Sequence, residues 1–171
     1  TITPDDSVKP DTIELKIQAR AGNSIACEEI LYVTVGQNKD ASLSLSTPKL
    51  SNAQPGTTER VELTVKNIGN GQDTFAVGGT NLPSGWQITL SSTSITVNGR
   101  HCGPNNCNEQ ILDVDIQIPT DALANIQYEL EFYVNSAGKE HDIISLEATV
   151  AAVHAVELSL IHISEPTRQA S

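Results

Sequence analysis

The stretch RVELTVKN, residues 60–67, decides the fold class of this chain. Apolar side chains occupy every second position, at Val61, Leu63 and Val65, and charged or hydroxyl side chains stand between them. Successive side chains of a β-strand point to opposite faces of the sheet. The pattern therefore predicts a strand with one face in a core and one face in water.

The same alternation recurs along the chain, and turn-forming clusters rich in Asn, Gly, Pro and Ser separate its occurrences. Further strands are predicted at residues 43–45, 74–77, 86–90, 94–97, 112–118, 128–134 and 144–150. Short strands with one apolar face and frequent turns indicate an all-β protein, an immunoglobulin-like sandwich of antiparallel strands. An up-and-down barrel is the alternative, and the irregular loop lengths argue against it.

Composition excludes some classes of function. The formal net charge is −11, which disfavours binding to nucleic-acid phosphates and indicates an acidic, self-repelling surface. We expect no membrane span in this fragment, because no apolar run approaches about 20 residues. No secretory leader is visible in the sequence.

An internal repeat appears when the sequence is compared with itself at an offset of 115 residues. Over residues 1–42 the identical positions are Pro4/Pro119, Asp6/Asp121, Glu14/Glu129, Leu15/Leu130, Leu31/Leu146, Thr34/Thr149 and Val35/Val150. The apolar face keeps its phase across the offset, and a slip of one residue would invert it. We therefore predict a tandem array. In this array, residues 1–38 are the C-terminal strands of a preceding repeat. Residues 39–153 form a complete sandwich, and residues 154–157 begin a further repeat.

Four turn motifs carry a resemblance to a known family. They are Pro55-Gly56 before a strand, the turn from Asn67 through Gly69 to Asn70, the Leu82-Pro83-Ser84-Gly85-Trp86 turn, and Pro119 leading to the strand that contains Tyr128. Together they resemble the immunoglobulin-like domain associated with carbohydrate-binding modules of bacterial alpha-galactosidases. They are also similar to the cell-adhesion-related domain of bacterial surface proteins. The resemblance implies display on a cell surface or secretion, spacer or adhesion roles, and no catalytic residues.

Trp86 is predicted to lie in the core and not on a ligand platform. It shares its parity with Ile88 and Leu90, whose side chains are apolar. Gly85 frees the turn that directs Trp86 inward, and Pro83 fixes an extended approach to it.

The cysteines predict one disulfide. Cys102 and Cys107 flank a four-residue Gly-Pro-Asn-Asn turn that can bring their Cα atoms within bonding range. Such a disulfide indicates an oxidising compartment. A zinc site with His101 and both thiolates is the alternative, although a fourth ligand is not evident. The partner of Cys27 is left open.

The sequence offers weak candidates for two classes of ligand. Asn38, Asp40, Asp113 and Asp115 are weak candidates for calcium, because hard oxygen ligands at a repeat junction could stiffen it; a solvated acidic face is the simpler interpretation. Carbohydrate binding needs exposed aromatic side chains. Only Tyr32 and Tyr133 are predicted to point outward.

Enzyme chemistry has no motif to support it, and no cofactor is expected. The histidines at 101, 141 and 154 are predicted to be solvated. The favoured function is a non-catalytic extracellular repeat that acts as a spacer, stalk or adhesion module, with neighbouring repeats of the same chain as partners and cell-surface glycans or proteins as further ones. The alternative is an accessory, carbohydrate-directed module of a secreted glycoside hydrolase or protease.

The last residues are expected to be foreign to the protein. LSLIHISEPTR, residues 158–168, is similar to one reading frame of a sequencing-library adapter over all eleven positions. Residues 158–171 are therefore expected to be non-native and to take no part in the fold or the function.

Overall fold

The computed structural model describes residues 8–103 and 105–152, and this part of the chain is built from β-strands. The strands are β1 Asp11–Ala21, β2 Ser24–Val35, β3 Ala41–Leu45, β4 Lys49–Ala53, β5 Thr58–Asn67, β6 Asp73–Thr80, β7 Gln87–Leu90, β8 Ser94–Val97, β9 Glu109–Gln117, β10 Gln127–Ser136 and β11 Lys139–Val150. The expected start of a further repeat at 154–157, the tail at 158–171 and His154 lie outside the described residues.

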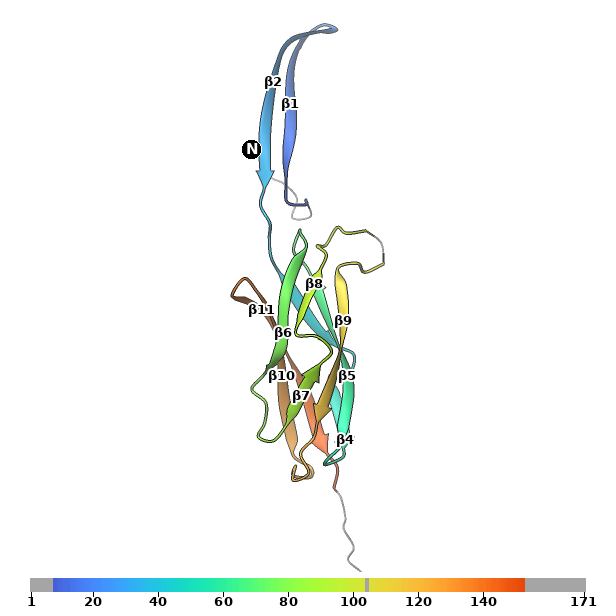
Figure 1. Cartoon of the computed structure of the whole chain (residues 1–171). Helices are drawn as coiled ribbons and strands as arrows, with labels where there is room; N and C mark the ends of the chain where they lie inside the picture. The colour runs from blue at the N-terminus through green and yellow to red at the C-terminus, as the bar shows by residue number, and fades with distance from the viewer. Residues whose placement is uncertain (1–7, 104, 153–171) are drawn as a thin grey trace, which may run out of the picture.

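Strands β3 to β11 form a sandwich of two sheets, as predicted (Figure 1). One sheet has the order β4-β11-β10-β6-β8 and the other the order β3-β5-β9-β7. Each sheet has its own edge strands, so the closed alternative is wrong. The inward-facing side chains that are least exposed, all below 2%, include Phe75, Phe132, Leu63, Ile116, Ile118, Leu130 and Leu146.

The stretch at residues 60–67 lies in β5, which pairs with β3 on one side and β9 on the other. Leu63 and Val65 are 0% exposed, and Val61 is 3% exposed. The strand is thus central in its sheet, with its apolar face against the opposite sheet. These exposures confirm the predicted alternation. Both edges of a central strand are hydrogen-bonded to neighbouring strands, so its two faces alone differ in environment, one in the core and one in water.

One strand and one pairing differ from the prediction. β4 was not predicted, since its sequence KLSNA lacks a clear apolar alternation. It pairs parallel with β11, so the sandwich is not wholly antiparallel. Pro48 separates β3 from β4; it cannot donate to a sheet ladder, and the chain changes sheets there. Leu50 and Ala53 then pack against the core from the second sheet.

Strands β1 and β2 form a separate antiparallel hairpin that extends beyond one end of the sandwich (Figure 1). Its register repeats that of β10 and β11 at an offset of 115 residues. Leu15 pairs with Leu31 as Leu130 pairs with Leu146. Both hairpins have a register shift at the same place, after Ala19 in the first and after the corresponding Val134 in the second.

The two hairpins differ in what covers them. Phe132 of β10 is 0% exposed, whereas Ile17, at the corresponding position of β1, is 58% exposed. Leu31 is 42% exposed and Leu146 0%. The hairpin β1–β2 therefore carries the apolar face of a sandwich strand pair without a sheet packed on it. Such a hairpin is marginally stable by itself.

No helix long and apolar enough to cross a membrane occurs in the described part of the chain.

Candidate functional site at the junction between hairpin and sandwich

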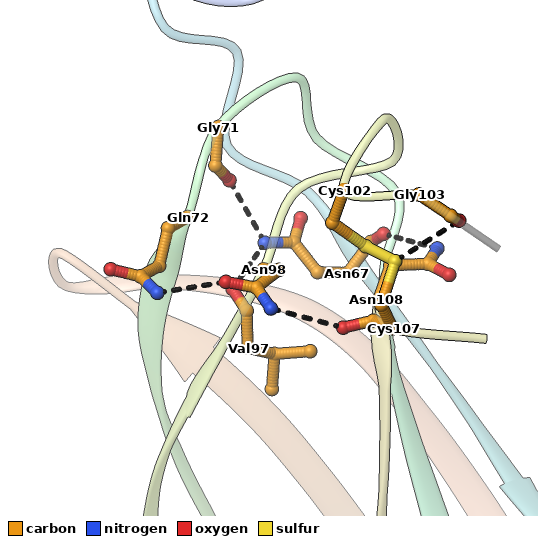
Figure 2. The surroundings of a disulfide bond; sticks show 9 residues. All are labelled: Asn67, Gly71, Gln72, Val97, Asn98, Cys102, Gly103, Cys107 and Asn108. Atoms are coloured by element: carbon orange, nitrogen blue, oxygen red, sulfur yellow. Dashed lines mark hydrogen bonds between the residues drawn. A yellow bond between two sulfur atoms is a disulfide. The ribbon is translucent and has the colours of Figure 1, made fainter. Parts of the chain in front are cut away.

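Asn67, at the end of β5, organises the loops at the end of the sandwich that faces the hairpin. Its side chain is fully buried, and its Nδ2 donates to the carbonyls of Gly71 and Val97 at 3.0 Å each. Its Oδ1 accepts a hydrogen bond from the Gly69 amide at 2.8 Å. Asn108 Nδ2 donates to the Asn67 carbonyl, as Figure 2 shows. One amide side chain thus joins the β5–β6 turn to the β8–β9 loop.

The β8–β9 loop is closed by the predicted disulfide, which is confirmed (Figure 2). Cys102 and Cys107 have their Cα atoms 5.9 Å apart. Gly103, Asn105 and Asn106 have positive φ values of 126°, 71° and 52°, which Gly and Asn tolerate better than other residues. Cys27 on β2 is exposed and has no disulfide partner among the described residues.

Removing the disulfide by the pair Cys102→Ser and Cys107→Ser is expected to lower the free energy of unfolding by about 2 kcal/mol, because the short closed loop regains chain entropy in the unfolded state. Urea titration of the variant and the parent measures the difference. Mass spectrometry of non-reduced peptides provides the control. Two free thiols in the parent protein, or equal stabilities, would contradict the prediction.

The tip of the β5–β6 turn holds the root of the hairpin. Asn70 is 6% exposed, and its Nδ2 donates to the carbonyls of Val8 at 2.9 Å and Gly36 at 3.0 Å. Its Oδ1 accepts a hydrogen bond from the Asn38 amide at 2.7 Å. Val8 precedes β1, and Gly36 and Asn38 follow β2. A single side chain therefore fixes both ends of the hairpin to the sandwich.

Gly71 makes the same junction close-fitting. A Cβ at this position would lie 2.8 Å from Pro10 Cγ and 3.2 Å from Gln37 Nε2. Gln37 Nε2 donates to the carbonyl of Gln72 at 2.9 Å. From the disulfide loop, the Arg100 amide donates to the Gly69 carbonyl at 2.9 Å and supports the turn from behind. The hairpin is docked on the sandwich and is not joined to it by the chain alone.

Two charged residues of the linker after β2 add a second set of contacts. Lys39 Nζ lies 3.0 Å from Asp73 Oδ1, and Ser136 Oγ donates to Asp73 Oδ2 at 2.8 Å. Ser136 Oγ also shares a hydrogen bond of 2.9 Å with His141 Nε2. His141 Nδ1 lies 3.4 Å from Asp40 Oδ1 without a hydrogen bond between them. The linker, β6 and the β10–β11 hairpin meet in this cluster.

The prediction that His141 is solvated is wrong, because its side chain is 1% exposed. Its position five residues after Ser136 places the two on facing strands across a tight turn, which the sequence could have shown. The sequence could not show that Asp40 and Asp73 come to the same place. Asp40, His141 and Ser136 follow one another in space like a catalytic triad. Ser136 is 5% exposed, however, and its hydroxyl already donates to the Asp73 carboxylate, so it does not present a nucleophile to solvent. His101 is exposed in the β8–β9 loop, as predicted.

Acid is expected to weaken this cluster through Asp73. Burial, the largest single influence, raises the pKa of Asp73, but the hydrogen bonds from Lys39, Ser136 and the Thr74 amide together with the charge of Lys39 lower it below 3.8. A carboxylate with a depressed pKa contributes stability above its unfolded pKa and loses it as the pH falls through the folded pKa. The melting temperature, measured between pH 6 and pH 2, should therefore fall less with acid in Asp73→Asn than in the parent. The exposed Asp121→Asn is the control, and an equal loss of pH dependence there would contradict the assignment.

A hollow of about 370 Å³ lies at the same junction. Its lining comes from the hairpin root, the β5–β6 turn and the disulfide loop, and is dominated by amide side chains and glycines. The described residues that line it include two basic ones, Lys9 and His101, and no Phe, Trp or Tyr. The hollow therefore lacks the aromatic face that carbohydrate binding was expected to need.

The four calcium candidates, Asn38, Asp40, Asp113 and Asp115, do not form a cluster of acidic side chains. Within residues 8–103 and 105–152 no group of three or more His, Cys, Asp or Glu could hold a metal ion. Asp115 on β9 pairs with Arg60, with 2.7 Å between Arg60 Nε and Asp115 Oδ1, and this hydrogen bond lowers the pKa of Asp115. Asp113 is on the same exposed face, and Asp40 accepts a hydrogen bond from the Ala41 amide. Calcium binding stays an untested prediction.

The turn and core signature occupies the positions that its chemistry suggests. Trp86 is 4% exposed and packs on Tyr128, with ring centroids 5.0 Å apart, so its predicted core position is confirmed. Its Nε1 has no partner among the described residues. Tyr128 Oη accepts a hydrogen bond from the Leu123 amide at 2.8 Å. Gly56 and Gly85 have φ values of 77° and 82° and face Thr120 and Pro119 respectively; Pro55 and Pro83 precede them in their turns.

The two tyrosines predicted to point outward behave differently. Tyr32 on β2 is 64% exposed. Tyr133 on β10 is half-buried, because its ring lies over Gly78 of the neighbouring β6, where an added Cβ would be 2.6 Å from the hydroxyl. The two side chains do not form a shared platform, since they belong to different sheets.

Comparisons with known proteins assign this chain to no family. No protein-family model and no curated protein matches the sequence. Among solved structures, a family 123 glycoside hydrolase from Clostridium perfringens is similar over 65% of this chain, with 8% identity and a TM-score of 0.47, and the match spans 27% of that chain. Domains 4 and 5 of the S-layer protein SbsC are similar over 84% of this chain and 59% of theirs, with 16% identity and a TM-score of 0.45. The PapD-like domain 7 of human CEP192 is similar over 66% of this chain and 87% of that chain, with 11% identity and a TM-score of 0.43.

Proposed function

We propose that the chain is a segment of a tandem array of immunoglobulin-like modules that serves as a non-catalytic spacer, stalk or adhesion element of a larger extracellular protein. The hairpin β1–β2 is the last strand pair of one module, and β3 to β11 are the next module. The array holds its modules in a fixed order along one axis, and neighbouring modules of the same chain are its first partners.

One observation carries the proposal: β1–β2 repeats the register of β10–β11, including the position of the register shift, at an offset of 115 residues. The offset also places the apolar face of the hairpin on the positions that β10 and β11 bury. A register is set by pairing along a whole strand, so agreement over ten pairs is a stronger sign of a repeat than seven identical residues. The uncovered apolar face, with Ile17 58% exposed, fits a strand pair separated from the sheets that normally cover it.

The chemistry of the surface supports an extracellular setting. The disulfide between Cys102 and Cys107 suits an oxidising compartment. The net charge of −11 favours solubility and opposes binding to nucleic acid. The buried hydroxyl of Ser136 and the lack of an aromatic face in the junction hollow give no support to catalysis or to carbohydrate binding by this segment.

A hybrid chain tests the repeat. Residues 39–125 are placed directly before Asp11, so that β1–β2 take the place of β10–β11 in the added module. We expect a second cooperative unfolding transition, and hydrogen exchange in β1 and β2 slowed toward that of β10 and β11. In the natural chain the same hairpin amides are expected to exchange rapidly, because no other described strand packs on β1 and β2.

A pair of substitutions makes the test specific. Leu15 occupies the position of Leu130, which is 0% exposed. Leu15→Arg should abolish the second transition of the hybrid and leave the stability of the natural chain unchanged. Gln18→Arg, on the polar face of the same strand, is the matched control and should be tolerated in both. Hairpin amides that exchange as fast in the hybrid as in the natural chain would refute the repeat.

A further inference from the structure

The far end of the sandwich carries the counterparts of the groups that Asn70 binds. At an offset of 115 residues, Val8 corresponds to Leu123 and Gly36 to Ala151. Leu123 lies in the β9–β10 connection, and Ala151 follows β11. The Asn125 amide donates to the Val150 carbonyl at 3.0 Å, so these two segments lie side by side. In the observed junction the corresponding segments likewise lie together, because Asn70 bridges them.

The carbonyls of Leu123 and Ala151 accept no hydrogen bond from the part of the chain that the structure describes. The neighbouring side chains are apolar and open to solvent, with Leu123 66% and Ile126 46% exposed. We call the surface formed by Leu123, Ile126 and the carbonyls of Leu123 and Ala151 the trailing face.

We propose that the trailing face is the docking surface for the β5–β6 turn of a following copy of the module, whose counterpart of Asn70 donates to the carbonyls of Leu123 and Ala151. The proposal rests on the tandem array proposed above and names the contact through which the array is held. The occupant is a second copy because the observed junction already shows this turn on the corresponding carbonyls.

Charge and position agree with this occupant. The turn sequence IGNGQ, residues 68–72, and the trailing-face sequence ALANI, residues 122–126, contain no charged residue, although the chain carries a net charge of −11. The two segments that would meet therefore bring no charged side chain into the contact. In Figure 1 the hairpin root and the end of β11 lie at opposite ends of the sandwich, so docking of successive copies gives a head-to-tail line.

A two-module chain tests the proposal: residues 1–153 followed by a second copy of residues 39–153. Residue 39 of the second copy then takes the place of residue 154, which preserves the spacing of the observed junction. We expect nuclear magnetic resonance relaxation and residual dipolar couplings to show both sandwiches tumbling as one body. The amides of Leu123 and Ala152 should shift relative to the single chain.

Gly71→Ala in the second copy is the discriminating variant. In the observed junction an added Cβ at Gly71 would meet Pro10 and Gln37 of the hairpin root, whose positions Asn125 and Ala152 take at the trailing face. We therefore expect the second sandwich to stay folded but tumble independently, with the amide shifts at Leu123 and Ala152 lost. In the natural chain the same substitution should speed exchange of the Asn38 amide by about tenfold, the effect of losing roughly one net hydrogen bond. For this measurement in the natural chain, Gly36→Ala is the matched control, since its Cβ would meet no atom within 4 Å.

Two results would overturn the proposal. One is a folded second sandwich that tumbles independently without any substitution, with Leu123 and Ala152 unshifted. The other is a Gly71→Ala variant whose junction is as rigid as the parent's. Either result leaves the tandem array itself standing if the hybrid chain buries β1–β2, whereas an unprotected hairpin in the hybrid refutes the array whatever the junction does.

Discussion

Asn67→Ala is expected to lower the free energy of unfolding by about 3 kcal/mol. The side chain is 0% exposed and makes three hydrogen bonds to backbone groups, those of Gly69, Gly71 and Val97. Alanine removes the Asn67 donor from the carbonyls of Gly71 and Val97, and leaves the Gly69 amide with only its second bond, to the Asp40 carbonyl. Each lost hydrogen bond costs about 1 kcal/mol. Chemical denaturation with a fitted slope measures the loss.

The control for this prediction is Asn98→Ala. Asn98 is exposed, and its bond from Nδ2 to the Cys107 carbonyl is long, at 3.4 Å. Its removal is expected to change stability by less than about 0.5 kcal/mol. If the two variants lose equal stability, Asn67 is not the residue that joins the two loops. Because Asn67 shapes the turn that carries Asn70, its loss should also speed exchange of the Asn38 amide.

Phe132→Ala is expected to cost about 4 kcal/mol. Phe132 is 0% exposed in the centre of β10, between β6 and β11, and its removal leaves a cavity that two packed sheets cannot close. Large-to-small changes at such phenylalanine positions cost about 3–5 kcal/mol, from lost transfer free energy and from the cavity. Thermal or urea unfolding followed by the fluorescence of Trp86 reports on the same core.

Ile17→Ala is the matched control for Phe132→Ala. Ile17 occupies the corresponding position of β1 but is 58% exposed, so its truncation should change the stability of the sandwich by less than about 0.5 kcal/mol. A large loss in Ile17→Ala would show that the hairpin is covered in solution. In the hybrid chain the same substitution should become costly, because the added module buries that face.

Much of the sandwich could be predicted because its signals are local. The alternation at residues 60–67 predicts β5, and the parity of Trp86 with Ile88 predicts its inward orientation; both depend only on the period of a strand. The spacing of Cys102 and Cys107 predicts their bond because four residues span a turn. Comparison of the sequence with itself at an offset of 115 residues predicts the first hairpin, because its apolar positions match those of β10 and β11.

What the sequence could not predict depends on residues far apart. β4 has little alternation of its own and forms because the edge of β11 offers it hydrogen bonds. His141 reads as a polar residue near a turn, yet Asp40, Asp73 and Ser136 enclose it, from segments up to 101 positions away. No local pattern contains that information, because burial depends on which elements pack together.

The sequence by itself determined the fold class, the faces of the strands and the disulfide, because each follows from spacing along one segment. Only the tertiary structure decided the junction. Asn70 lies in a common turn, and its role arises because Val8, Gly36 and Asn38 place two carbonyls and an amide around it. Hydrogen bonds between segments more than 30 residues apart depend on the docking of complete elements, and the chain order does not record that docking.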